Sequence, residues 1–140
     1  MLIKPKKSLG QNFLHDENII NKIINASKIS SDDQVLEVGP GTGNLTKLII
    51  SQKPKKIYVV EKDNNLATKL NEEFKNQIIM INDDILKINE NFISDEQLIV
   101  FGNLPYNIST EILCKWILNL TGKDFWFESL VLMFQKEVAD

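Results

Sequence analysis

The chain has 140 residues, the length of one domain that can bury its own hydrophobic core. Hydrophobic residues make up 43% and charged residues 25%, as in soluble globular proteins, which excludes a disordered tail, a collagen-like repeat and a membrane protein. A single cysteine excludes an internal disulfide framework, and a single histidine argues against a zinc cluster. No signal peptide opens the chain, so we expect a soluble, cytoplasmic protein that holds no metal.

The charge is unevenly distributed along the chain. The net charge is −3, all sixteen basic residues are lysine, and residues 1–28 carry +3 against −6 for the remainder. A basic arm ahead of an acidic body suits a segment that faces a polyanion, although short lysine-rich termini are usually just solvated. Without arginine, any phosphate contact has to come from lysine, helix N-termini and backbone N–H groups.

Predicted helices and strands alternate along the chain. Helices are expected after an N-cap at Asp16, across 45–49 before the break at Pro54, through 66–74 and over 110–118. Short apolar runs predict strands at 35–38, 57–60, 78–81, 98–101 and 130–134. This alternation is typical of βαβ units and predicts an α/β fold with a mostly parallel sheet.

In a parallel sheet of this kind, ligands bind beyond the carboxyl ends of the strands. The residues that directly follow the predicted strands are therefore the functional candidates: Gly39–Gly43, Glu61, Asp84, Asn103–Tyr106 and Gln135. Other conspicuous side chains receive a structural interpretation. Cys114 is expected to be a core thiol, Trp116 and Trp126 to be core or boundary aromatics, and His15 to be peripheral.

A glycine-rich turn after the first strand is the first candidate. Gly39-Pro40-Gly41-Thr42-Gly43 ends a strand and opens a helix, and its spacing differs from the G-x-G-x-x-G pattern that binds a pyrophosphate. Glu61 ends the second strand, where nucleoside-binding α/β folds place an acid that accepts hydrogen bonds from both ribose hydroxyls. Together they indicate a nucleoside ligand without phosphates, against the alternatives of a purely structural turn and a solvated glutamate.

The third and fourth strands end in groups that suit an adenine. A carboxylate of Asp83-Asp84 can accept from an adenine amino group, or it can simply cap a helix. Asn103-Leu104-Pro105-Tyr106 offers a side-chain acceptor, a proline-fixed turn with an exposed carbonyl and an aromatic stacking face. In isolation, one such tetrapeptide can also be a plain turn.

Several motifs follow one another in a characteristic order: Leu9–Leu14, Glu37–Gly43, Glu61, Asp84, Asn103–Ser109 and Gln135–Val138. Taken together, they resemble the ribosomal RNA adenine dimethyltransferase family, most closely its small-subunit branch, from about Lys7 to the last residue. G-Q-N-F-L and N-L-P-Y-N-I-S are highly specific, whereas the glycine turn alone indicates only a methyltransferase. The resemblance implies a Rossmann-like, class I S-adenosylmethionine-dependent methyltransferase fold with helices on both faces of the sheet.

The resemblance also implies roles for individual residues. The cofactor site would be formed by the N-terminal segment, the glycine turn and the strand ends, through Asn12, Leu14, Gly39, Gly41, Glu61, Asp84, Ile85 and Asn103. The catalytic loop would be Asn103, Leu104, Pro105 and Tyr106. Asn103 and the Leu104 carbonyl would accept the two N–H groups of the target amine, and Tyr106 would stack on the adenine ring.

The implied reaction transfers methyl groups from S-adenosylmethionine to the exocyclic amines of two adjacent adenines in small-subunit (16S) ribosomal RNA, giving dimethyladenosine. The implied partner is the immature small ribosomal subunit, with a role in its biogenesis, and a monomer is expected. Residues 1–15 would form an arm and lid. Residues 16–140 would form a catalytic domain that ends after about the fifth strand, without the helical C-terminal domain of the relatives.

Two alternatives stay open beside this interpretation. The macrolide-resistance branch dimethylates an adenine of large-subunit RNA, but its members more often show S-Q-N-F and N-I-P-Y where this chain has Gly10-Gln11 and Asn103–Tyr106. A non-catalytic ribosome-assembly factor is the rival from another class, although every motif position expected to bind cofactor is intact. Leu104 disfavours a DNA adenine methyltransferase, and the glycine spacing disfavours a NAD-dependent oxidoreductase.

Overall fold

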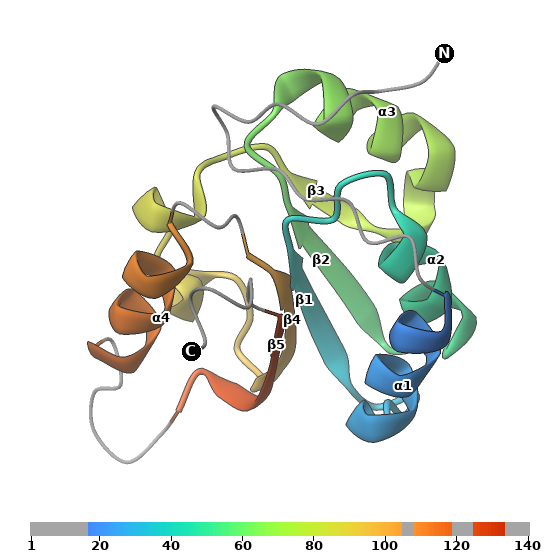
Figure 1. Cartoon of the computed structure of the whole chain (residues 1–140), viewed down its shortest axis with the longest axis horizontal. Coiled ribbons are helices and arrows are strands. Elements are labelled where there is room, and N and C mark those ends of the chain that lie inside the picture. The colour runs from blue at the N-terminus through green and yellow to red at the C-terminus, as the bar shows by residue number, and fades with distance from the viewer. Residues whose placement is uncertain (1–16, 105–107, 119–124, 134–140) are drawn as a thin grey trace.

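The computed structural model describes residues 17–104, 108–118 and 125–133, which form a five-stranded sheet between helices (Figure 1). The strands are β1 (Gln34–Val38), β2 (Lys56–Val60), β3 (Ile79–Ile81), β4 (Leu98–Asn103) and β5 (Phe127–Met133). The helices are α1 (Glu17–Ser27), α2 (Asn44–Ser51), α3 (Asn64–Phe74) and α4 (Ser109–Leu118), with short 3-10 helices η2 (Lys75–Gln77), η3 (Ile85–Lys87) and η4 (Glu90–Phe92). The predicted alternation of helices and strands is confirmed. None of these helices is both long and apolar enough to cross a membrane.

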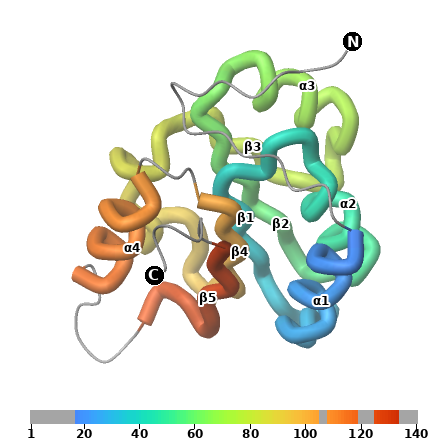
Figure 2. Tube along the Cα trace, in the orientation of Figure 1, coloured from blue at the N-terminus to red at the C-terminus, as the bar shows by residue number. Residues whose placement is uncertain are grey.

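All neighbouring strands run parallel, in the order β3-β2-β1-β4-β5. β1 is therefore central, and the chain extends the sheet first through β2 and β3 and then, from the other side of β1, through β4 and β5 (Figure 2). The order reverses between β1 and β4, and such a switch point opens a crevice beyond the carboxyl ends of the strands. The topology confirms the predicted parallel sheet and defines where the candidate residues should meet.

The central strands are buried on both faces, as expected for a parallel sheet between helices. Successive residues of a strand point to opposite faces. One face packs against α1, α2 and α3, in a cluster that contains Val35 and Phe101. The other face packs against α4 and η3, in a cluster that contains Leu36, Val100 and Trp116. Both clusters pack the strands tightly, so the residues at the strand ends are held in fixed positions.

β5 begins earlier than its sequence pattern predicted. The predicted strand covered 130–134, whereas β5 starts three residues before that range. Leu98 pairs with Phe127 but Ile99 pairs with Ser129, so one extra residue lies between the two pairs. Such a bulge interrupts the two-residue alternation by which a strand is recognised in a sequence.

Cys114 is exposed, so the prediction of a core thiol is wrong. α4 buries Ser109, Ile112 and Trp116, a stripe with three- and four-residue spacing. Cys114 lies two residues from Ile112 and from Trp116, about 200° around the helix, and therefore points away from the sheet. Trp116 and Trp126 are buried, which confirms their assignment to the core.

Candidate active site

The turn after β1 brings the glycine-rich segment against the end of β4. Gly39 has a φ of +71°, and its N–H donates to the Val60 carbonyl at 3.2 Å. A Cβ atom on Gly39 would lie 2.7 Å from the Asn103 carbonyl oxygen, closer than real Cβ atoms approach. The close approach of two backbones therefore requires glycine here. This close approach places the turn and Asn103 side by side at the switch point.

Glu61 follows β2 directly and faces the same turn. It is 7% exposed, and its Oε1 accepts a hydrogen bond from the Asp63 N–H at 2.9 Å. Burial raises the pKa of Glu61 to about 7, although hydrogen bonds from the backbones of Asp63, Lys62 and Gly41 favour the charged form. The contribution of Gly41 means that the acid and the glycine turn share one site.

Neighbouring groups hold the backbone around Glu61 in place. The Glu61 N–H donates to the Ile81 carbonyl at 3.1 Å, and the Asn82 side-chain amide donates to the Glu61 carbonyl at 2.9 Å. Asp63 is buried and caps α3, where its Oδ1 accepts from two backbone N–H groups at 2.9 and 3.0 Å. Glu61 is thus presented from a fixed turn, which suits a carboxylate that has to meet a ligand.

A second buried carboxyl group, Glu37, interacts electrostatically with Glu61 and received no role from the sequence. It lies inside β1, is 1% exposed, and accepts a hydrogen bond at Oε1 from Thr46 Oγ1 at 2.5 Å. Burial raises the pKa of Glu37 to about 7; the Thr46 hydrogen bond opposes this shift and the charge of Glu61 adds to it. The available signal was a charged residue within the apolar strand V-L-E-V, an arrangement that is unfavourable without a partner.

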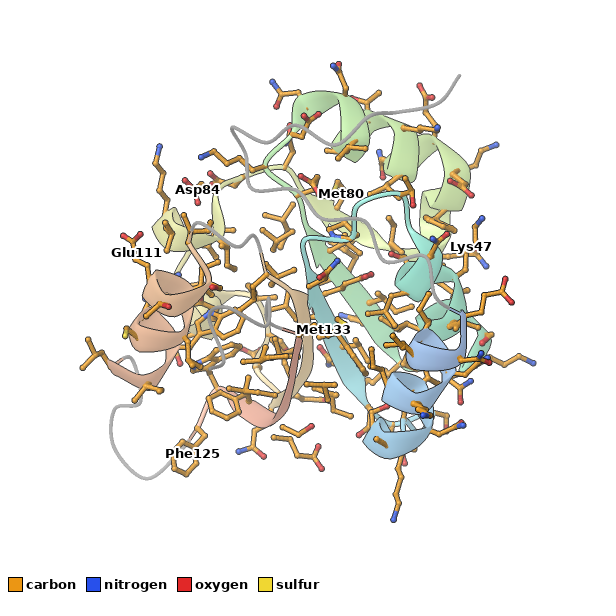
Figure 3. The ribbon with its side chains drawn as sticks, viewed as in Figure 1. Lys47, Met80, Asp84, Glu111, Phe125 and Met133 are labelled. Atoms are coloured by element: carbon orange, nitrogen blue, oxygen red, sulfur yellow. The ribbon has the colours of Figure 1, made fainter. Side chains whose placement is uncertain are left out.

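Asp84, beyond β3, caps η3. Its Oδ1 accepts from the Leu86 N–H at 3.0 Å, and its Oδ2 lies 3.4 Å from Lys62 Nζ. Burial disfavours the charged form, but these partners outweigh it and hold the pKa of Asp84 below its usual range. The capping interpretation is therefore confirmed for Oδ1. Ile85 beside it is buried, and Figure 3 shows Asp84 beyond the strand ends on the side of α4.

Asn103 is the last residue of β4 and half-buried, and Leu104 after it is only 2% exposed. The Leu104 side chain folds back over the strand, where a Cβ added to Gly102 would lie 2.8 Å from its Cδ2. This anchored side chain fixes the point at which the backbone leaves β4. The sequence-based candidates outside the described residues are Asn12, Leu14, His15, Asp16, Pro105, Tyr106 and Gln135.

The structure thus brings together the glycine turn, Glu61 and Asn103, and Asp84 joins the same edge through Lys62. The groups available to a ligand at this site are backbone amides, carboxylates and one side-chain amide. Within the described segments, no group of three or more His, Cys, Asp or Glu side chains is placed to hold a metal ion. Acceptors beside glycines that allow close approach suit a ligand rich in hydroxyl and amine donors, as nucleosides are.

The family described as ribosomal RNA adenine dimethylase matches residues 3–140. The chain is 64% identical over 140 residues to ribosomal RNA small subunit methyltransferase A of Pelagibacter ubique (strain HTCC1062), which covers 100% of this chain and 53% of that protein. It is 45% identical over 135 residues to the protein of the same name from Malacoplasma penetrans (strain HF-2), covering 96% and 47%. The chain therefore spans about half the length of these relatives.

Two solved structures resemble the fold closely. The 23S rRNA methyltransferase ErmE matches with a TM-score of 0.76 and 29% identity, over 91% of this chain and 50% of that one. A dimethyladenosine transferase from Plasmodium falciparum matches with a TM-score of 0.76 and 32% identity, over 91% and 45%. These matches confirm the predicted Rossmann-like methyltransferase fold. Since the family model covers nearly the whole chain, this protein belongs to the ribosomal RNA adenine dimethylase family.

Proposed function

We propose that the chain carries the cofactor site and part of the target pocket of an enzyme that dimethylates two adjacent adenines of small-subunit ribosomal RNA. The observation that carries the proposal is the meeting of Gly39, Glu61 and Asn103 at the switch point, in a chain 64% identical to a small subunit methyltransferase A. Family and fold both imply S-adenosylmethionine as the cofactor.

The residues at the switch point fit this cofactor. The Glu61 carboxylate would accept hydrogen bonds from the ribose hydroxyls, and Gly39 and Gly41 let a ligand approach the turn closely. Asp84 would accept from the adenine amino group, while the buried Ile85 packs beside the ring. When bound, S-adenosylmethionine supplies an electrophilic methyl group.

The target amine would be oriented by the end of β4. The exocyclic nitrogen of adenine is a poor nucleophile because its lone pair is delocalised into the ring. The Asn103 side chain and the Leu104 carbonyl would accept its two N–H groups and favour a pyramidal nitrogen whose lone pair is free to react. This is catalysis by positioning, and the buried Leu104 side chain supports it by fixing the backbone.

The remaining roles lie on residues outside the described part of the chain. Asn12 and Leu14 would close over the methionine end of the cofactor as part of a lid formed by residues 1–15. Pro105 would shape the target loop, and Tyr106 would stack on the target adenine, which has to be unstacked from its RNA to enter the pocket. The partner would be the immature small ribosomal subunit in the cytoplasm, with the enzyme acting as a monomer.

The small-subunit target is favoured over the large-subunit one. The chain is 64% identical to a protein named as a small subunit methyltransferase but 29% identical to ErmE, a 23S rRNA methyltransferase. A non-catalytic assembly factor is the second candidate to test. It predicts binding to ribosomal RNA without binding of the cofactor.

The deciding experiment is calorimetric titration of the folded chain with S-adenosylmethionine, with NAD as the control ligand. We expect saturable binding of S-adenosylmethionine only. Methyl transfer is then measured on unmodified small and large ribosomal subunits, with the protein at the full length of its relatives. A full-length protein that binds no S-adenosylmethionine would favour the assembly factor, and methylation of the large subunit alone would favour the macrolide-resistance branch.

Asn103→Ala tests the positioning of the target amine. We expect methyl transfer to fall about 10²–10³-fold, because one preorganised acceptor is lost, while cofactor affinity changes by less than about threefold. Single-turnover methyl transfer and calorimetry measure the two effects separately. Equal losses in both would contradict the role of Asn103 at the target.

A further inference from the structure

A buried ion pair lies between α4 and the 3-10 helices η3 and η4. Lys115 Nζ is 2.6 Å from Glu90 Oε1, and the two side chains are 18% and 0% exposed. Lys115 Nζ also donates to the backbone carbonyls of Ile85 and Ile88. The three N–H groups of the ammonium therefore converge on three acceptors. Trp116 Nε1 donates to the same Glu90 oxygen at 2.8 Å.

Lys115 binds the carbonyl of Ile85, the first residue of η3, and that of Ile88, which directly follows its last residue. A single 3-10 turn is too short to be stable by itself and leaves its terminal backbone groups without internal partners. Asp84 holds the first end, where its Oδ1 accepts from the Leu86 N–H and its carbonyl accepts from the Lys87 N–H at 2.9 Å. Lys115 holds backbone carbonyls at both ends of the helix. Two side chains from different elements thus fix this three-residue helix.

The contacts between Lys115 of α4 and η3 also link the two halves of the proposed site. η3 begins at Ile85, which with Asp84 would form the adenine side of the cofactor site. α4 begins at Ser109, at the end of the target-loop motif that starts with Asn103. Ile85 also shares a buried cluster with Leu104 and with residues of α4. Movement of η3 relative to α4 would therefore change the distance between cofactor and target.

We propose that Lys115 is a positioning residue, which sets the adenine side of the cofactor site relative to the helix that follows the target loop. The inference rests on the proposed function, and Lys115 itself touches neither ligand in it. Its loss would release two backbone carbonyls and leave Glu90 as a buried charge. Glu90 Oε2 already has no hydrogen-bond partner among the described residues, so Lys115 is the cation that makes this carboxylate tolerable.

A second ion pair of equal length, which lies at the amino ends of the strands, provides the control. Lys55 Nζ lies 2.6 Å from Glu96 Oε1, and the side chains are 49% and 48% exposed. Exposed pairs contribute little to stability. Lys55 precedes β2 and Glu96 precedes β4, so both lie at the amino ends of the strands. Lys55→Met therefore removes the same charge from a pair of the same length, far from the proposed site.

The test compares Lys115→Met with Lys55→Met by calorimetry. The probes are S-adenosylmethionine and 5′-methylthioadenosine, which keeps the nucleoside and lacks the amino acid. Lys115→Met should weaken binding of both probes by the same factor, about tenfold, because the nucleoside side of the site is displaced. Lys55→Met should stay within about twofold of the wild type. Wild-type affinities in Lys115→Met would overturn the proposal.

Glu90→Gln separates positioning from general stability. The glutamine keeps an acceptor for Trp116, and Lys115 keeps both carbonyls of η3. We expect lower stability in urea but cofactor affinity within about threefold of the wild type. A loss of affinity as large as that of Lys115→Met would overturn the assignment to the carbonyl contacts. If Lys115→Met does not fold, Lys115→Arg replaces it, with a smaller loss that is again equal for both probes.

Amide hydrogen exchange tests the same inference without any ligand. Exchange at Leu86 and Lys87 should be faster in Lys115→Met than in the wild type and unchanged in Lys55→Met, because the Leu86 and Lys87 N–H groups are held only while η3 is ordered. Unchanged exchange at both amides would overturn the proposal. A wild-type chain that binds neither probe would count against the proposed function, and this measurement would still decide whether Lys115 orders η3.

Discussion

The amino edge of the sheet, where its strands begin, and the carboxyl edge, where they end, both contain residues with positive φ angles. The reasons differ between the two edges. At the amino ends, Lys28 and Lys53 have φ angles of 50° and 54°, and each follows the last turn of a helix. Their side chains are exposed, and a left-handed residue there simply ends the helix. At the carboxyl ends, Gly39 has a similar angle, but a Cβ atom there would collide with the backbone of Asn103. A positive φ therefore ends a helix at one edge and allows the close approach of two backbone segments at the other.

The polar groups of the two edges differ in the same way. At the amino edge, Gln34 Oε1 accepts from Tyr58 at 3.2 Å and from Ser94 at 2.7 Å, so these groups satisfy one another. At the carboxyl edge, Glu37 and Glu61 are buried near each other, and the pKa of each is raised to about 7. A cationic ligand with hydroxyl donors would relieve this cost. Among the described residues, two buried carboxyl groups with raised pKa values therefore distinguish the carboxyl edge from the amino edge.

The largest effect in this comparison is expected for Gly39→Ala. The new Cβ would meet the Asn103 carbonyl at 2.7 Å in a backbone conformation that alanine disfavours, so we expect a loss of about 2–4 kcal/mol in the free energy of unfolding. Urea denaturation measures this loss, and calorimetry of the remaining folded protein should detect no cofactor binding. An alanine variant as stable as the wild type would show that the close approach of Gly39 to Asn103 does not require glycine, and the contrast between the two edges would fail.

Glu61→Ala should weaken S-adenosylmethionine binding by about 1–3 kcal/mol, because a buried acceptor for two hydroxyls is lost. The wild type should also bind more weakly at pH 6 than at pH 8, by up to about tenfold. Since the pKa of Glu61 is raised to about 7, the carboxyl group takes up a proton over this range and loses acceptor capacity. Titrations at pH 6, 7 and 8 check both effects. An affinity independent of pH in the wild type, as expected for Glu61→Gln, would remove Glu61 from the site.

Glu37→Gln should stabilise the protein at pH 8, by about 1–2 kcal/mol. The folded pKa of Glu37, about 7, lies above its ordinary value of 4.5, so the folded state keeps a proton that the unfolded chain releases as the pH rises. Wild-type stability should therefore fall from pH 5 to pH 8, and the variant should show less of this fall. Urea denaturation across this range tests it, with Glu96→Gln as the exposed control. If the free energy of unfolding changes equally with pH in the wild type and in Glu37→Gln, the result would contradict the burial of a charge at Glu37.

The smallest effect is expected at the amino edge. Lys53→Gly should raise the free energy of unfolding by up to about 1 kcal/mol, because glycine adopts the φ of +54° without steric cost. Lys28→Gly should behave in the same way. Thermal unfolding measures both variants, and cofactor affinity should stay unchanged. A destabilised Lys53→Gly would mean that flexibility gained by the unfolded chain outweighs the strain relieved in the helix stop.

Much of the fold could be predicted because its signals are local. Apolar runs and helical spacing identified the five strands and four helices, and the glycine turn and Glu61 follow from their places after strands. Where the pattern failed, a specific feature interrupted it. The register shift near Leu98 concealed the start of β5, and an apolar run around Cys114 concealed which face of α4 is buried.

The order of the elements could be predicted from the sequence alone, as could the parallel sheet and the chemical groups at the strand ends, since these depend on periodicity and position along the chain. Which groups interact with one another depends on how distant segments pack in three dimensions. Glu37 interacts electrostatically with Glu61 on the neighbouring strand's end, and Lys115 reaches Glu90 and the carbonyls of Ile85 and Ile88 from another helix. Those contacts arise from packing between segments 24 to 30 residues apart, and no local pattern of apolar and polar residues records them.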